Sequence, residues 1–160
     1  MHTIYKAPQS SLLDNIKADL LDGRSVRLQA KGWSMLPMIW NERDTLVLAP
    51  ISQEHLKVGM IVFAQTGSGR YIIHRIARIV RTRIELRGDG NPYQEEYVHP
   101  QTVFGELIEV QQKNRYLRKG DWRWRAYALL WPKNGNIRRI LLFFYRRLFL
   151  RYAFTLIGKL

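Results

Sequence analysis

The sequence predicts a mainly β fold, with a short helix before the β region and a basic helical tail after it. Between residues 25 and 110, short runs rich in β-branched residues alternate with turn signals, as is typical of an antiparallel sheet. Before this region apolar residues recur at helical spacing, and after about residue 118 the chain becomes rich in tryptophan, arginine and leucine. The length of 160 residues, 46% of them hydrophobic, favours one domain with a buried core over two full domains.

We expect residues 1–24 to form one short amphipathic helix. Its apolar positions fall at helical spacing: Leu12, Leu13, Ile16, Leu20 and Leu21. Ser10 and Ser11 precede them, and Gly23 follows where a left-handed C-terminal cap belongs.

Residues 25–118 are predicted to form the β domain. The expected strands are Val26–Ala30, Thr45–Leu48, Met60–Ala64, Tyr71–Ile79, Ile84–Arg87 and Val103–Val110. We interpret the glycine-rich stretch at residues 67–69 as a hairpin turn.

The net charge of +13 belongs to the end of the chain. Residues 1–110 hold 13 Lys and Arg against 12 Asp and Glu, whereas residues 111–160 hold 13 against Asp121 alone. Residues 119–160 are therefore predicted to be a basic aromatic and apolar tail, helical from about Ile137 to Leu160.

Several classes of protein are disfavoured by what the sequence lacks. Without cysteine there is no disulfide, cysteine nucleophile or thiolate metal site. No phosphate-binding loop, dinucleotide fingerprint or histidine pair suited to a metal is present, so we predict no metal and no cofactor. No secretory signal is visible, and arginines interrupt the tail too often for a spanning helix, so any membrane contact is expected to be peripheral.

Ser34 is the candidate nucleophile. It lies in a turn framed by Gly32, Trp33, Met35 and Pro37, where a strand is expected to end and a side chain to be presented at a rigid corner. A serine hydroxyl needs a neighbouring base to act as a nucleophile at neutral pH, and most serines in turns are structural. The assignment therefore depends on a partner elsewhere in the chain.

His74 is the candidate base, because imidazole titrates near neutrality and can accept and then return a proton. Strand alternation places it on the same face as Ile72 and Ile76, so a structural core histidine is the competing interpretation. An acidic turn follows at Gly88, Asp89 and Asn91, with Glu95 and Glu96 just beyond it. A carboxylate from this segment could orient the imidazole, although Asp89 could equally close an Asx turn.

Five short motifs occur in a defined order within residues 25–110. They are Gly-x-Ser-Met-x-Pro at 32–37, Gly-x-Ile-Val-Phe at 59–63, Ile-His-Arg-Ile at 73–76, Gly-Asp-x-Asn at 88–91 and Val-Phe-Gly-Glu-Leu at 103–107. Together they resemble the signal peptidase I family of serine peptidases, of the kind that has histidine in place of the lysine base.

The resemblance implies a coiled β-sheet domain and peptide-bond hydrolysis by a Ser–His mechanism. Ser34 would attack, His74, followed by Arg75 in its motif, would carry the proton, and the Ser34 backbone N–H would help to bind the oxyanion. In such relatives an acidic residue shortly after the Gly-Asp-x-Asn motif assists the histidine, and the corresponding region here offers Glu95, whereas Asp89 matches the acid of the motif itself. As the residue that orients His74 we favour Asp89, with Glu95 as the alternative. The substrate would be a peptide or preprotein whose leader or signal segment is removed.

The chain departs from the family pattern at two points. Gly32 stands where members often have a hydroxyl residue that donates to the oxyanion, and the basic apolar segment lies after the catalytic region instead of before it. The family's self-cleaving repressor branch is disfavoured, because the 24 residues before Ser25 are too few for a DNA-binding domain and the base is not lysine.

The tail is predicted to bind a membrane surface from the cytoplasmic side, because aromatic side chains favour the headgroup level and arginines attract anionic lipid. Two alternatives stay open: a helix that simply packs on the β domain, and a non-catalytic basic module that binds nucleic acid or a partner, of which nucleic acid is disfavoured. The sequence does not indicate the oligomeric state.

Overall fold

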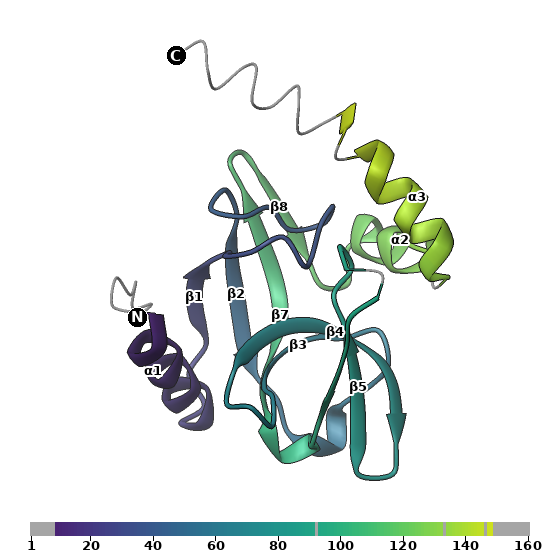
Figure 1. Cartoon of the computed structure of the whole chain (residues 1–160). Coiled ribbons are helices and arrows are strands. Elements are labelled where there is room, and N and C mark those ends of the chain that lie inside the picture. The colour runs from purple at the N-terminus through teal and green to yellow at the C-terminus, as the bar shows by residue number, and fades with distance from the viewer. Residues whose placement is uncertain (1–8, 92, 133, 146, 149–160) are drawn as a thin grey trace.

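The computed structural model describes residues 9–91, 93–132, 134–145 and 147–148. It confirms a mainly β fold: an antiparallel sheet with helix α1 on one side and helices α2 and α3 on the other (Figure 1). Two single-turn 3₁₀ helices, Gln53–His55 and Pro100–Thr102, lie in the connections.

Helix α1 spans Gln9–Leu21 and buries Ile16 and Leu20 against the sheet. Its C-terminus closes as predicted at Gly23, whose φ of 81° is left-handed. The N–H of Gly23 donates to the Leu20 carbonyl and that of Arg24 to the Asp19 carbonyl, which are the two hydrogen bonds of a Schellman motif. The predicted helix is therefore confirmed, and its apolar face forms part of the core.

The sheet has eight strands in the order β1-β2-β7-β3-β4-β5-β6, and β8 also pairs with β7. The strands are β1 Val26–Gln29, β2 Thr45–Pro50, β3 Ile61–Gln65, β4 Tyr71–Val80, β5 Arg83–Arg87, β6 Glu95–Val98, β7 Val103–Gln112 and β8 Arg115–Arg118. All six predicted strands are present, and β6 and β8 were not predicted. The hairpin turn at residues 67–69 is confirmed, with the Thr66 N–H bonded to the Arg70 carbonyl at 2.9 Å.

Strand β7 holds the sheet together because it pairs with β2 along one edge and with β3 and then β8 along the other. Bulges in the β2–β7, β3–β7 and β4–β5 ladders shift the register by one residue each. Such bulges bend and twist strands, which lets a long sheet curve over its own core. Curvature brings β4, β5 and β6 within reach of the loop that follows β1.

The core consists of two apolar clusters on opposite faces of β3. One cluster joins α1 to the sheet through Phe63, Leu107 and neighbours, and the other fills the space between β3 and β6 through Val62, Ile76 and Leu86. Because β3 is buried on both faces, its residues from Ile61 to Ala64 are apolar without alternation.

The tail contains two helices in its described part, α2 Trp122–Leu130 and α3 Gly135–Tyr145. Helix α2 lies within the tail that was predicted to be helical, although no separate helix was predicted before Ile137, and it places Trp124 in the first core cluster. Helix α3 confirms the N-terminal part of the predicted tail helix, whereas the stretch from residue 149 onward lies outside the described residues. None of the described helices has the length and apolar character required to cross a bilayer.

Candidate active site

Ser34 lies half-buried in the loop between β1 and β2. The loop turns sharply at Gly32, whose φ is 92° and whose N–H donates to the Asn41 side chain at 2.8 Å. Met35 anchors the loop in the core, and the bond before Pro37 is cis. The predicted turn is present, since the N–H of Leu36 donates to the Trp33 carbonyl, and Trp33 is exposed beside it.

The turn that contains Gly88 and Gly90 is pressed directly against this loop. The N–H of Gly90 donates to the Ser34 carbonyl at 2.7 Å. A Cβ atom on Gly88 would lie 2.5 Å from the Ser34 carbonyl oxygen, and one on Gly90 would lie 2.5 Å from that of Trp33. Only glycine allows so close an approach of two backbones, which explains the Gly-x-Gly spacing. Asn91 closes the turn by accepting from the N–H groups of Tyr93 and Gln94.

His74 approaches Ser34 from the middle of β4, where it is paired with Val62 of β3. Its side chain is buried on the same face as Ile72 and Ile76, as alternation predicted. A Cβ atom added to Gly88 would lie 3.1 Å from Cβ of Ser34 and 3.2 Å from Nε2 of His74. Ser34 and Nε2 of His74 are thus neighbours across Gly88.

The other imidazole nitrogen faces a carboxylate. Nδ1 of His74 lies 2.5 Å from Oε2 of Glu96, and both side chains are buried. Among the described residues neither atom has another hydrogen-bond partner. Glu96 is itself held through its second oxygen by Arg70 and by Gln94, the latter at 3.1 Å. Glu96 therefore holds the imidazole with Nε2 directed toward Ser34.

Burial lowers the pKa of His74 below its ordinary value of 6.5, because the interior disfavours the charged ring. The negative charge of Glu96 opposes this effect without overcoming it. The ring is therefore neutral at neutral pH, which is the state that a general base requires.

The residues expected to orient His74 are placed differently. Both oxygens of Asp89 bind the Arg75 guanidinium, at 2.9 and 2.6 Å, and Glu95 on the exposed face of β6 pairs with Arg87. The predicted contact of Asp89 or Glu95 with the imidazole is therefore wrong, and Glu96 occupies that position. The physical reason is strand alternation, since Glu96 and Val98 point inward whereas Glu95 points outward.

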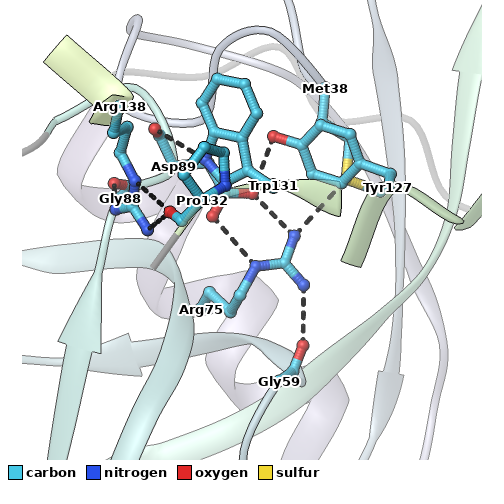
Figure 2. Close-up of polar contacts among 9 residues, drawn as sticks. All are labelled: Met38, Gly59, Arg75, Gly88, Asp89, Tyr127, Trp131, Pro132 and Arg138. Carbon is cyan, nitrogen blue, oxygen red and sulfur yellow. Dashed lines mark hydrogen bonds and ion pairs between the residues drawn. The ribbon is translucent and has the colours of Figure 1, made fainter. Parts of the chain in front are cut away.

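Asp89 instead joins the β domain to the tail (Figure 2). Its side chain accepts from the Tyr127 hydroxyl at 3.2 Å, and its carbonyl accepts from the Trp131 indole N–H at 3.2 Å. Burial, reinforced by the charge of Asp89, raises the pKa of Tyr127, so the phenol stays protonated and donates. Arg75, the ion-pair partner of Asp89, also donates to the Gly59 carbonyl at 2.8 Å.

Arg138 of α3 completes this network from the other side. Its side chain is buried and donates to the Gly88 carbonyl at 3.3 Å and to the Pro132 carbonyl at 2.9 Å. The tail thus holds this turn through three donors: Trp131 and Arg138 bind the carbonyls of Asp89 and Gly88, and Tyr127 binds the Asp89 side chain. Since Gly88 touches both Ser34 and His74, these tail residues support the site without lining it.

Ser34, His74 and Glu96 line one groove of about 420 Å³. Its apolar walls come from α1, β1, β4 and the Ser34 loop: Leu12, Leu13, Leu28, Ala30, Met35 and Ile73. Strand β1 is the terminal strand of the sheet, and its last residues run along the groove. The groove therefore offers a strand edge that no other described strand pairs with, beside a nucleophile and next to surfaces that suit apolar side chains.

The groove contains one donor for an oxyanion, the Ser34 N–H, and lacks a second donor from the side chain at position 32. Within the described residues, the Ser34 N–H donates to no acceptor, so it is available to an incoming oxygen. Gly32 contributes no hydroxyl, as expected from its identity. Within the described part of the chain, no hydrogen bond joins the Ser34 hydroxyl to His74, whose Nε2 lies across Gly88 from it.

Sequence reasoning therefore missed Glu96 and the three tail donors. The signal for Glu96 was available, because alternation across residues 95–98 pairs it with the apolar Val98. The contacts of Tyr127, Trp131 and Arg138 join residues 38 to 50 positions apart and have no local signal.

Comparison with known proteins adds no assignment, because no family model and no curated protein matches the chain.

Proposed function

We propose that this chain is a serine endopeptidase of the signal peptidase I type, which removes a leader or signal segment from a peptide or protein. The observation that carries the proposal is the alignment of Ser34, His74 and Glu96 in one groove. A nucleophile, a neutral base and a carboxylate behind the base are the parts of an acyl-transfer site. The curved sheet is compatible with the coiled sheet of that family.

The mechanism assigns one role to each group. Nε2 of His74 takes the Ser34 proton as Oγ attacks the substrate carbonyl carbon, and the Ser34 N–H stabilises the oxyanion that forms. The imidazolium, stabilised by Glu96, then gives its proton to the leaving amine as the C–N bond breaks. Water, deprotonated by His74, attacks the ester carbonyl carbon. The imidazolium returns that proton to Oγ as the C–O bond breaks, which releases the carboxylic acid and restores both Ser34 and the neutral base.

The groove supports an extended substrate. A peptide that adds alongside β1 would form main-chain hydrogen bonds to the unpaired edge of that strand and place alternate side chains against the apolar walls. Such binding selects small or apolar side chains near the cleaved bond and tolerates varied sequence elsewhere, as a leader peptidase requires.

The test is cleavage of a peptide library by the full chain, followed by mass spectrometry of the new termini. Ser34→Ala should abolish cleavage, with a loss of about 10⁴-fold or more. Ser68→Ala, in the exposed hairpin turn, is the matched control and should cleave as the wild type does. Quenching in acid during turnover should trap an acyl group on Ser34. Cleavage by Ser34→Ala at the wild-type rate would sink the proposal.

A further inference from the structure

Helix α3 is an inverted helix in its burial: compared with an ordinary surface helix, it buries a charged side chain and exposes most of its apolar ones. Its buried residues are Arg138 and Leu142, whereas most of its large apolar side chains face outward. In a soluble domain the apolar stripe of such a helix normally faces the core. The outward side chains, each 43% to 58% exposed, are Ile137, Ile140, Leu141, Phe143 and Phe144.

Helix α2 extends this surface. Leu129 and Leu130 at its C-terminal end are 84% and 80% exposed. The two helices lie next to each other at one side of the sheet (Figure 1). We call the seven side chains of α2 and α3 the apolar face, and exposed patches of this kind mark interaction sites.

Positive charge accompanies the apolar face. Arg123, Arg125 and Arg139 are exposed on the same two helices, and Asp121 is the only acidic residue from position 111 onward. Trp122 is 73% exposed at the start of α2. Outward aliphatics and aromatics, flanking arginines and an exposed tryptophan are the features that suit the interface of an anionic bilayer.

We propose that the apolar face of α2 and α3 docks on an anionic lipid surface without crossing it. Nucleic acid would use the arginines but gain nothing from seven outward apolar side chains. A second copy of the chain would bring two strongly basic tails together. If the two helices simply packed on the β domain, their apolar side chains would be buried. Among the described residues of α2 and α3 only Trp124, Arg138 and Leu142 are buried, and the apolar face stays uncovered.

Docking is independent of peptidase activity, so its test fails or succeeds separately from the proposed function. The full chain is sedimented with vesicles of phosphatidylcholine containing 30% phosphatidylglycerol, and with vesicles of phosphatidylcholine alone. We expect binding to the anionic vesicles at physiological salt and at least about tenfold weaker binding to the neutral ones.

Two sets of variants separate the contributions. Ile140→Ser with Phe144→Ser should weaken vesicle binding about tenfold or more, whereas Val58→Ser with Val80→Ser, exposed on the β domain, should not. Arg125→Gln with Arg139→Gln should reduce the preference for anionic lipid, and Lys57→Gln with Arg81→Gln is the charge-matched control. Unchanged melting temperatures establish that each variant is folded.

Tryptophan fluorescence gives a second readout. Brominated lipid should quench tryptophan fluorescence of the wild type, and Trp122→Phe should remove more of this quenching than Trp33→Phe. Equal binding by the Ile140/Phe144 variant and its control would overturn the proposal. Self-association removed by that variant without vesicle binding, or tail-dependent retention of DNA or RNA alone, would also overturn it.

Discussion

Glu95 and Glu96 are sequence neighbours on opposite faces of β6, and only Glu96 reaches His74. Glu96→Gln removes the negative charge that stabilises the imidazolium, so we expect the cleavage rate to fall by at least about tenfold and by no more than about 10⁴-fold. Glu95→Gln is the matched control and should cleave at nearly the wild-type rate. Steady-state kinetics at neutral pH checks both, and a larger loss for Glu95→Gln would contradict the assignment.

The pH dependence of cleavage follows from the lowered pKa of His74. The base is active when neutral, so activity should be constant at neutral pH and fall on acidification, with a midpoint below 6.5. Because Glu96 raises this pKa, Glu96→Gln should move the midpoint to lower pH still. A pH profile of kcat/KM for both proteins provides the measurement, and a midpoint above 6.5 in the wild type would be inconsistent with it.

Folding stability should respond to the same group. Since the folded-state pKa of His74 lies below that of the unfolded chain, the unfolded state binds the proton first as pH falls. The free energy of unfolding should therefore be unaffected by this group above about pH 6.5 and decrease below it. Urea unfolding measures this effect. Between pH 7.5 and 5.5 the free energy of unfolding should decrease less for His74→Asn than for His99→Asn, a variant at an exposed histidine.

The Gly88 turn is the element on which the site depends. Gly88→Ala forces a Cβ to within 2.5 Å of the Ser34 carbonyl oxygen, so the two loops must separate. We expect a loss of about 1–3 kcal/mol in the free energy of unfolding and a large fall in kcat. Gly67→Ala, in the hairpin turn with nothing within 4 Å, should change neither by much. Chemical denaturation measures the free energy of unfolding of both variants, and steady-state kinetics measures their kcat.

The tail helices should affect catalysis through that turn. Arg138→Gln leaves the Gly88 and Pro132 carbonyls without their buried donor, which should cost about 1–3 kcal/mol in stability and reduce kcat more than it changes KM. Arg139→Gln, one position along but exposed, is the control. A kcat unchanged in Arg138→Gln despite the lower stability would restrict the tail to a purely stabilising role.

Elements defined by local pattern could be predicted, and those defined by distant contacts could not. The runs at Ile61–Gln65 and Tyr71–Val80 are rich in β-branched residues, whereas Glu95–Val98 and Arg115–Arg118 are polar and become strands because a partner strand is present. Likewise Ser34 and His74 stand in recognisable turns and strands. The role of Glu96 depended on which face of β6 it occupies.

At the scale of the whole molecule, the two functions proposed for this chain occupy different parts of it. The groove lies among α1, β1 and β4, and the apolar face lies on α2 and α3 at the other side of the sheet. The Gly88 turn connects them, because Arg138 on the buried side of α3 and Ser34 in the groove both contact it. A substrate in the groove and a surface on the apolar face therefore do not compete for space.

The inverted helix also has a consequence for how the protein behaves in solution. At low ionic strength a net charge of +13 makes molecules repel one another and keeps the apolar faces apart. Added salt shortens the range of that repulsion, to about 3 Å at 1 M, and strengthens the tendency of apolar surface to leave water. Solubility should therefore fall as salt rises, opposite to the usual salting-in of charged proteins, and mild detergent should restore it by covering α3.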